Sequence, residues 1–533
     1  MSDHAREVAQ TLDRRKFIVA GSSALAGLAG CQSVPAVDPG PAEPTSHRPR
    51  TGYLFALGVA SGEPMPDSVV LWTRLAPDPL NGGGMAPAPV PVQWEIAEDE
   101  AMQLVVRRGQ VSARSESAHA VHVEAQGLRP DRWYWYRFHA RGEASPIGRT
   151  RTAPSPSASP GRLSFAVASC QDFQNGYYGA YRHMARESVD FVLHLGDYIY
   201  EYAGRPGRVR EHRGGETVTL ADYRNRYAQY RADPDLQAAH AAFPWLAVWD
   251  DHEVENDYAG SHSEKQTPAA EFLRRRAAAY RAYFEHMPLR PSMAPRGPRL
   301  PLYRRRTFGA LVDLFLLDER QYRGDQACPG PRFGGQVVNP DKCVELADPR
   351  RTMLGAEQER WLYQGTARSR GRWTVIGQQL LMGSLTQTTR EGEPGVWTDG
   401  WDGYPAARRR IADHLIAAKV PNPVVLGGDI HSYWVTDLKQ DYRDPRSPTL
   451  ASEFVATSIS SAGVPQVIVD AGLKLPHIKF AESRFRGYIR CTVTPTLWRS
   501  DLQTVDTIAR PDAKLATLKS FAVEAGRPGP QPA

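Results

Sequence analysis

The sequence lacks three features that would each point to a particular class of protein. No apolar run reaches the ~20 residues that a membrane-spanning helix needs, so a multi-pass membrane protein is excluded. The 65 basic residues are well mixed with the 59 acidic residues and form no long basic run, so we expect no nucleic-acid-specific binding. The chain also contains no internal repeat.

The remaining composition is that of an ordinary soluble globular protein, since 41% of the residues are hydrophobic and 23% are charged. The 533 residues exceed the length of one typical domain. We therefore expect two or more domains and enough chain for a large core. The formal net charge of +6 favours an anionic substrate only weakly.

Residues 1–31 have the pattern of an export signal, because the basic stretch Asp13-Arg-Arg-Lys-Phe-Ile18 precedes a short apolar segment. The paired arginines resemble a twin-arginine signal, which predicts passage through the twin-arginine export machinery. The run Leu28-Ala-Gly-Cys31 resembles a bacterial lipobox, in which Cys31 would carry a lipid anchor. The alternative is an ordinary cleaved signal in which Cys31 is incidental. In either case we expect an exported protein that is periplasmic, membrane-anchored or extracellular.

Four cysteines remain beyond the signal, and an even number in an exported protein suggests disulfide bonds. Cys328 and Cys343 flank a loop rich in proline and glycine and are the predicted pair. Cys491 lies in a strand pattern, which predicts a buried free thiol. Cys170 follows an apolar run and has polar neighbours, so it is treated with the candidate site below.

Two compositional breaks divide the chain beyond the signal. Residues 32–50 are rich in proline and small polar residues and predict a flexible linker. The Pro/Ser-rich segment 153–160 separates a first domain, predicted at 51–152, from a second domain, predicted at 161–520. In the first domain, short alternating or aromatic-rich runs at 69–74, 90–96 and 133–138 predict an antiparallel β-sandwich of the fibronectin or immunoglobulin type.

In the second domain, apolar strand patterns alternate with helical patterns. Strands are predicted at 163–170, 191–195, 244–250, 311–318, 374–377 and 423–429, and helices at 177–188, 220–242, 272–284 and from 355 onward. The order strand, helix, strand predicts βαβ units and a parallel or mixed sheet. The predicted fold is therefore an α/β (α+β) layered sandwich of mixed sheets and helices, preceded by a β-sandwich domain.

Four of these strands end in a cluster of polar side chains. The clusters are Cys170 with Asp172, Asp197 with Tyr200, residues 250–253, and Asp429 with His431. Because adjacent strand ends lie about 5 Å apart across a sheet, the four turns predict one shared pocket. Carboxylates, a thiol, a phenol and imidazoles gathered in one pocket predict a metal site. Taken singly, each cluster has the alternative of capping acids and packing tyrosines.

The order of the clusters resembles that of the calcineurin-like metallophosphoesterases, whose pattern runs D-x-H, G-D, N-H-[ED] and H-x-H. Gly196-Asp197 matches the second block, whereas the other three clusters depart from their blocks. The residues of these three clusters, together with other runs of the chain, resemble those of the alkaline phosphatase D family. Five runs carry this resemblance in order: 58–63 with 68–74, 168–171, 194–202, 249–256 and 427–432. The resemblance extends from about residue 54 to the C-terminal region.

The resemblance implies a mixed site in which ferric iron (Fe3+) lies beside calcium (Ca2+). A thiolate, a phenolate and an imidazole suit iron, and carboxylates suit calcium. The implied ligands are Cys170, Tyr200 and His431 for iron, Asp197 as the bridge, and Asp251, Asp429 and Asn256 for calcium. Asp172 lies where the family varies, and a surface acid is its equal alternative.

The implied reaction is hydrolysis of phosphate mono- or diesters by a metal-activated water. His252 would assist the leaving oxygen or orient the phosphate, unless it is a structural histidine held by an acid. Arg320 would bind phosphate through its guanidinium, with Arg323 a weaker candidate. We expect a monomer. The alternatives are a phospholipase D-like phosphodiesterase and, outside the enzymes, a lipid-anchored binding or adhesion protein with structural metals.

Overall fold

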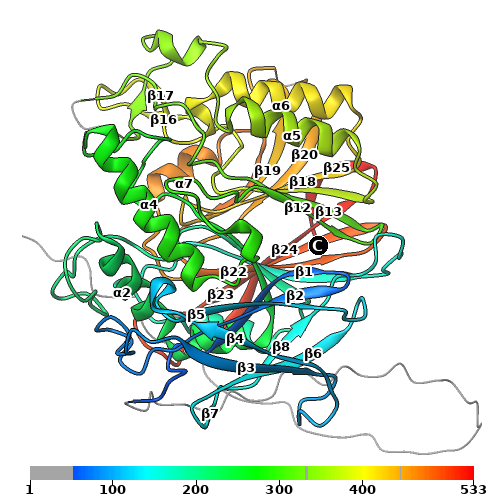
Figure 1. Ribbon diagram of the computed structural model, residues 1–533. Coiled ribbons are helices and arrows are strands. Elements are labelled where there is room, and N and C mark those ends of the chain that lie inside the picture. Colours follow the sequence, from blue (N-terminus) through cyan, green and yellow to red (C-terminus); the bar gives the residue numbers. More distant parts are fainter. Residues whose placement is uncertain (1–51, 331–333, 445) are drawn as a thin grey trace, which may run out of the picture. The chain divides into compact units, whose positions relative to one another are not determined.

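The computed structural model describes residues 52–330, 334–444 and 446–533. The predicted signal, the predicted linker and Cys31 lie outside these residues. Within them, no helix combines the length and the apolar character that crossing a bilayer requires. The described chain is built on two large sheets, one of ten strands and one of seven (Figure 1).

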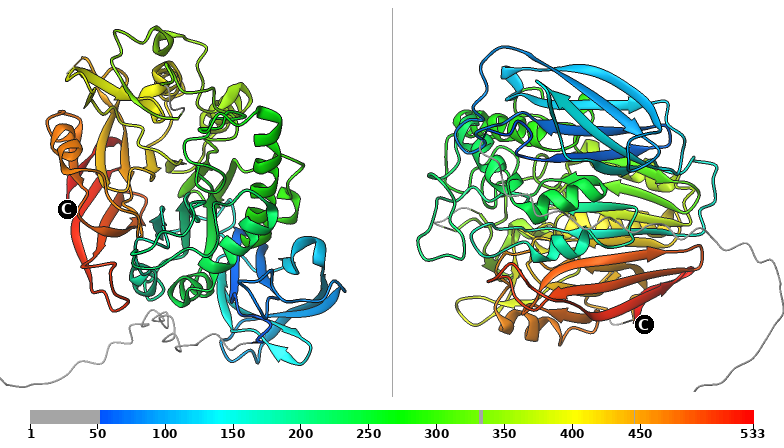
Figure 2. Two further views of the ribbon diagram at one scale, coloured as in Figure 1. Left: turned by 90° about the vertical axis from the view of Figure 1, so that its left-hand side faces the viewer. Right: turned by 90° about the horizontal axis from the view of Figure 1, so that it is seen from below.

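The ten-stranded sheet contains strands from both ends of the described chain, which lie at its opposite edges (blue and red in Figure 2). In spatial order the strands are β25 (Arg527–Pro532), β24 (Leu515–Glu524), β23 (Leu497–Val505), β22 (Arg486–Val493), β9 (Leu163–Ala168), β10 (Phe191–Leu195), β11 (Pro244–Val248), β1 (Val59–Met65), β2 (Ser68–Arg74) and β5 (Ala120–Gln126). The central strands β9, β10 and β11 are parallel and fully buried. Strands buried on both faces are apolar throughout, as their sequences show.

The seven-stranded sheet is mixed. In spatial order its strands are β12 (Arg304–Phe308), β13 (Val312–Leu316), β15 (Trp373–Gly377), β18 (Pro423–Gly427), β20 (Thr449–Val455), β19 (Tyr433–Lys439) and β21 (Ile478–Glu482). The four strands β13, β15, β18 and β20 run parallel to one another. A separate small sheet contains β14 (Val337–Val338), β17 (Pro394–Trp397) and β16 (Gln387–Thr388).

Helices cover the outer faces of the two sheets. They are α1 (Gly179–Met184), α2 (Leu220–Arg231), α3 (Pro234–Ala242), α4 (Ala269–His286), α5 (Gly355–Ala367), α6 (Pro405–Ala417) and α7 (Gln466–Gly472). Trp245 of β11 stacks on His240 of α3 with ring centroids 3.8 Å apart. Helices α5 and α6 pack on the seven-stranded sheet through a cluster that includes Phe315 and Ile376 (Figure 1).

The main core lies between the two sheets. Alternate residues of β13, such as Leu314, join Leu193 and Leu195 of β10 in one buried cluster, while Phe315 points to the helices. This period of two is the expected side-chain alternation of a strand. The arrangement of helices, sheet, sheet and helices confirms the predicted layered α/β fold.

The helical region predicted at 220–242 is two helices, so the prediction of one helix is wrong there. α2 ends at Arg231, and α3 begins at Pro234. The carboxylate of Asp233 accepts hydrogen bonds from the backbone amides of Asp235 (2.9 Å) and Leu236 (3.1 Å). An Asp cap followed by a proline in the first helical turn starts a new helix.

The N-terminal β-sandwich is confirmed as an antiparallel β region, but one of its sheets is shared. Its own sheet contains β4 (Val105–Ala113), β3 (Val90–Ala97), β6 (Trp133–Ala140), β7 (Glu143–Ala144) and β8 (Gly148–Arg151). The facing layer is β1, β2 and β5, and β1 pairs in parallel with β11 through Ser61 opposite Pro244. The ten-stranded sheet therefore runs without a break from the sandwich into the second domain.

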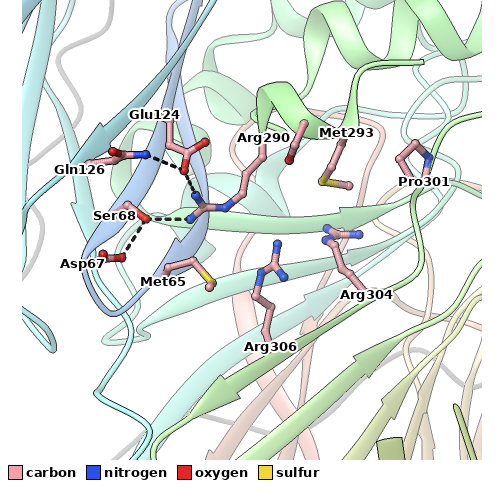
Figure 3. A pocket seen from close by; sticks show the side chains of 11 residues that line it. Met65, Asp67, Ser68, Glu124, Gln126, Arg290, Met293, Pro301, Arg304 and Arg306 are labelled. Carbon is pink, nitrogen blue, oxygen red and sulfur yellow. Dashed lines mark hydrogen bonds and ion pairs between the residues drawn. The ribbon is translucent and has the colours of Figure 1, made fainter. Parts of the chain in front are cut away.

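Charged side chains reinforce this junction. Arg304 and Arg306 of β12 point into a cavity of about 490 Å³ shown in Figure 3. Both arginines bind the carboxylate of Glu63 on β1, which is fully buried. Arg290 binds Glu124 of β5 at 2.6 Å and also donates to the backbone oxygen of Glu63. These ion pairs link the sandwich strands to the seven-stranded sheet.

The predicted cysteine chemistry is confirmed. Cys328 and Cys343 form a disulfide, and Cys170 and Cys491 are free and buried.

Candidate metal centre

The predicted polar clusters meet between the two sheets. Three of them follow β9, β10 and β11, which are neighbours in the ten-stranded sheet. The fourth, with Asp429 and His431, follows β18 of the seven-stranded sheet. The prediction that all four are neighbouring ends of one sheet is therefore wrong. The pocket instead has one wall from each sheet.

The backbone is left-handed at four candidate ligands. The φ angles are 58° at Cys170, 55° at Asp197, 63° at Asp429 and 53° at His431. A non-glycine residue in such a region costs of order 1–3 kcal/mol and persists where the surrounding structure fixes it, often at functional sites. The turns therefore aim these side chains at a common point at some cost in stability.

The first group of ligand atoms brings together Cys170, Asp197 and His431, whose atoms all lie within 4.8 Å of one another. The phenol of Tyr200 joins them, donating to Asp197 Oδ2 at 2.8 Å and lying 3.1 Å from His431 Nε2. His431 Nδ1 lies 2.8 Å from the backbone oxygen of Ala462. Because a carbonyl oxygen only accepts, Nδ1 carries the hydrogen and Nε2 is free to bind a metal.

Two further groups continue from the first. Asp197, Asp251 and His252 form one, and Asp250, Asp251 and Asp429 form the other, each within the same 4.8 Å limit. Asp197 belongs to the first and second groups, and Asp251 to the second and third. The three groups thus form one continuous set, with Asp197 at the position of a bridge.

The burial and the charges of these groups favour a bound cation. Burial, followed by the charge of neighbouring groups, raises the pKa values of Cys170, Asp197, Tyr200 and Asp429 well above their ordinary ranges. Among the described residues, Asp197 Oδ1 and Asp251 Oδ1 are buried without a hydrogen-bond partner. Buried carboxylate oxygens without a partner are costly unless a metal ion or a proton compensates them. The donor set therefore fits bound metal ions.

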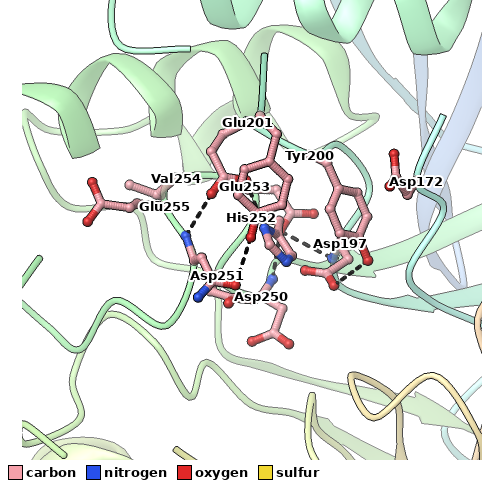
Figure 4. A network of polar contacts seen from close by, with 12 residues as sticks. Asp172, Asp197, Tyr200, Glu201, Asp250, Asp251, His252, Glu253, Val254 and Glu255 are labelled. Carbon is pink, nitrogen blue, oxygen red and sulfur yellow. Dashed lines mark hydrogen bonds and ion pairs between the residues drawn. The ribbon is translucent and has the colours of Figure 1, made fainter. Parts of the chain in front are cut away.

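His252 is held by an acid that sequence analysis did not single out. Its Nδ1 lies 2.7 Å from Glu201 Oε2, and its ring lies against that of Tyr200 (Figure 4). Glu201 is fully buried and also accepts the backbone amide of Asn256 at 2.9 Å. Burial alone would lower the pKa of His252, but the charges of Glu201 and Asp251 raise it well above the ordinary value. The charges of these acids therefore favour the protonated imidazole.

Asn256 and Asp172 lie in other surroundings. Asn256 Oδ1 accepts the phenol of Tyr202 at 3.0 Å. Asp172 accepts the backbone amide of Gln174 at 2.9 Å, and it lies outside the three groups. A role of Asn256 as a calcium ligand stays a prediction.

Arg320 reaches the site but is fully buried. It forms ion pairs with Asp250 and with Asp399, the latter at 2.8 Å. Its Nη2 has no hydrogen-bond partner among the described residues and lies 3.6 Å from Asp251 Oδ1 and 3.9 Å from Asp429 Oδ1. Arg323, the weaker candidate, is also buried and pairs with Asp399 at 2.8 Å. A role in phosphate binding for either arginine stays a prediction.

Besides Glu201, two further residues position the ligand turns without having been predicted to do so. The carboxylate of Glu253 accepts the backbone amides of Asp197 (3.2 Å), Tyr198 (2.5 Å) and Asp250 (2.8 Å), and so ties two ligand turns together. Its place in the acidic run 250–253 was a usable signal. Ser461 donates to the phenol oxygen of Tyr200 at 2.7 Å and lies 2.9 Å from the backbone oxygen of Cys170. It had no signal in the sequence beyond its serine-rich turn.

Known protein families match the chain in two parts, an N-terminal part and a longer second part. The family described as "PhoD-like phosphatase" matches residues 165–502, and "PhoD-like phosphatase, N-terminal domain" matches residues 41–154. Alkaline phosphatase D of Bacillus subtilis (strain 168) is 47% identical, over 97% of this chain and 89% of that protein. A solved structure titled "Structure of PhoD" has a TM-score of 0.85 and 46% identity, over 91% of this chain and 93% of that one.

Proposed function

Because the chain belongs to the PhoD-like phosphatase family, we propose that it is an exported phosphoric ester hydrolase with ferric iron and calcium in its site. Membership of the family makes it an alkaline phosphatase D-like hydrolase with candidate metal-binding groups. The identity of the metals and the export are the added parts of the proposal.

The ligand assignment follows the chemistry of the donors. Cys170, Tyr200 and His431 would hold iron, because thiolate, phenolate and imidazole suit it. Asp251 and Asp429 would hold calcium, which takes oxygen ligands. Asp197, shared by two groups of ligand atoms, would bridge the ions. When bound, such ions polarise phosphoryl oxygens and lower the pKa of a water molecule.

The protein's own residues prepare the site for an ester. Glu201 accepts from His252 Nδ1, which leaves Nε2 as the ring nitrogen free to interact with a substrate. As a cation, His252 can donate the Nε2 proton to a phosphoryl or leaving-group oxygen. Glu253 keeps the turns of Asp197 and Asp250 at a fixed spacing through three backbone amides. Accurate spacing matters because small misplacements of reacting groups reduce the rate strongly.

The observation that carries the proposal is the position of the Tyr200 phenol, within hydrogen-bond distance of both Asp197 and His431. A phenolate on ferric iron absorbs visible light, so we expect the purified, metal-loaded protein to be coloured and to contain iron and calcium. Tyr200→Phe should weaken the colour. Tyr202→Phe is the matched control, because that phenol donates to Asn256 and lies outside the ligand groups, and it should keep the colour.

A colourless, iron-free protein with full activity would overturn the iron assignment. Activity itself is tested separately with Asp197→Asn, which removes the charge of the bridging carboxylate. We expect release of phosphate from esters to fall at least 100-fold, on the scale of the loss that follows removal of one group that stabilises the transition state. Unchanged activity of Asp197→Asn would refute the role of this carboxylate. A metal-loaded wild type that releases no phosphate would favour a binding protein that keeps its metals for structure alone.

The location and organisation of the protein are further proposals that rest on the sequence. Residues 1–31 would direct a folded monomer through the twin-arginine machinery, and residues 51–152 and 161–520 would form the two domains. A lipid on Cys31 would hold the protein at the membrane. Cell fractionation of the protein and of Cys31→Ser tests this, since the variant should move from the membrane to the soluble exported fraction. Equal distribution of both would refute the lipid anchor.

A further inference from the structure

A cavity of about 300 Å³ opens directly beside the metal centre. Asp429 and His431 form part of its lining. Large apolar side chains that line it include Leu381, Leu385, Trp397, Ile430, Val464 and Ile468. They come from the loop before β16, from the end of β17, from the turn after β18 and from α7 with the residues just before it. The cavity therefore joins the candidate ligands Asp429 and His431 to apolar side chains.

Among residues 52–330, 334–444 and 446–533, no lysine or arginine lines this cavity. Two of its acids are already engaged by neighbours. Asp399 pairs with Arg320 and Arg323, and Asp402 pairs with Arg408 at 2.7 Å. The arginines that approach the cavity are therefore already paired with acids. A second phosphate or a carboxylate on the ligand would find no free cation among the described lining residues, and a charge buried without a partner is unfavourable.

The apolar wall is anchored in the core. Leu381 and Leu385 are buried in a cluster with Trp434, and Ile430 and Ile468 pack against the same cluster. These side chains therefore present apolar surface to the cavity from a fixed position, as preformed ligand sites do.

Trp397 forms an exposed part of the wall. Its ring lies directly over Gly335, where a Cβ would come within 2.5 Å of the ring. Trp397 still exposes 37% of its surface, so it has apolar area left to cover a ligand.

From these contacts we propose that the cavity binds the organic group of the phosphate ester, and that this group is an uncharged alkyl or aryl chain. The inference rests on the proposed function, because it places the phosphoryl group at Asp429 and His431. It adds a substrate class: esters with an apolar group of several carbons and no second negative charge. Esters that carry further phosphates would be poor substrates.

The test uses two series of esters on the metal-loaded protein, n-alkyl phosphates and n-alkyl 4-nitrophenyl phosphates, from ethyl to hexyl. The leaving-group chemistry is constant within each series, so only burial of the chain changes. In the series that the enzyme cleaves, we expect kcat/KM to rise about fourfold for each added methylene, the factor that corresponds to burial of one CH2 group. An alkyl phosphate with a second, terminal phosphate should fall below the uncharged ester of the same length.

Adjacent residues of α7 supply matched variants. Ile468 lines the cavity, whereas Val467 is 71% exposed and does not. Ile468→Asn should flatten the dependence of kcat/KM on chain length, because it replaces apolar surface of the cavity wall with a polar side chain. Val467→Asn should leave the whole series unchanged. Trp397→Ala should also flatten the dependence of kcat/KM on chain length, because it removes apolar surface from the exposed part of the cavity wall.

The outcomes separate the two proposals. If the wild type cleaves the short esters but shows no rise with chain length, or prefers the doubly phosphorylated ester, the cavity inference is wrong and the phosphoesterase stands. The cavity inference is equally wrong if Val467→Asn flattens the series as much as Ile468→Asn. If no ester in either series is cleaved by the loaded protein, the proposed function itself fails.

Discussion

Replacing Gly196 by alanine tests how the ligand turns are spaced. Gly196 directly follows β10 and precedes Asp197, with a φ of 107°. A Cβ at this position would lie 2.7 Å from the amide nitrogen of Asp250 and 3.0 Å from the carbonyl carbon of Trp249. It would lie closer still to the Cβ of Asp250. These atoms are backbone or close to it and have no freedom to rotate away.

The size of the effect follows from these contacts. Ordinary contacts of a Cβ begin at 3.4 Å, so the turns after β10 and β11 must separate. The closest contact sets a separation of about 1 Å, which equals the misplacement that costs ~100-fold in rate. The left-handed conformation adds about 1–2 kcal/mol for an alanine, and the overpacking adds about 1–3 kcal/mol. We expect Gly196→Ala to lose bound metal and to lower kcat/KM by roughly 100-fold.

The assay measures metal content, kcat/KM and the denaturant midpoint on the same preparations. Gly207→Ala is the matched control, because Gly207 has a φ of 79° but nothing within 4 Å of its Cβ position. The control should show the conformational cost alone, with metal content and activity of the wild type. If Gly196→Ala binds metal and turns over like Gly207→Ala, the close approach of these turns does not set the geometry of the site.

Three further changes test other parts of the structure. Glu63→Gln removes the carboxylate that Arg304 and Arg306 share, so denaturant unfolding should show a loss of about 3–5 kcal/mol, and an unchanged midpoint would refute the role of this ion pair. Burial and a neighbouring acid raise the pKa of Asp235 from 3.8 to about 6. The stability that the protonated carboxyl contributes is therefore fully present below pH 3.8 and is lost as the pH rises through about 6. Asp235→Asn should therefore be more stable than the wild type near pH 7.5 and equal to it near pH 3.5, and a constant difference would contradict the shifted pKa. Cys343→Ser opens a disulfide that spans 15 residues of sequence separation. The free energy of unfolding should fall by about 3 kcal/mol in the same measurement. An unchanged free energy of unfolding under oxidising conditions would contradict this role of the disulfide.

Much of the fold could be predicted because it depends on local patterns. The apolar runs of β9, β10, β11 and β18 mark buried strands whatever surrounds them. The break between α2 and α3 was also visible, since Asp233 and Pro234 are a start signal, but the helical spacing on both sides concealed it. The pairing of β1 with β11 was not predictable. It joins backbone atoms of Ser61 and Pro244, and no pattern of side chains records it.

The residues of the candidate site also fall into those that local sequence patterns predict and those that they do not. Cys170, Asp197 and Asp429 each follow an apolar strand, so their convergence could be predicted from the sequence. Glu201 and Ser461 could not be found, because each acts through a residue distant in the chain. Glu201 is 51 positions from the histidine that it holds, and Ser461 is 261 positions from the phenol that it contacts. The burial of an arginine such as Arg320 likewise depends on packing and not on its neighbours in sequence.

The shared ten-stranded sheet restricts how this protein can change over evolutionary time. Strand β11 is an interior strand only because β1 lies on its outer side. A lineage that lost the N-terminal strands would leave β11 as an open edge directly behind an acidic ligand turn, and open edges invite pairing with other chains. The N-terminal region therefore cannot be shuffled between proteins as a free module. It is inherited together with the site, and any ancestor that lacked it needed another strand in the place of β1.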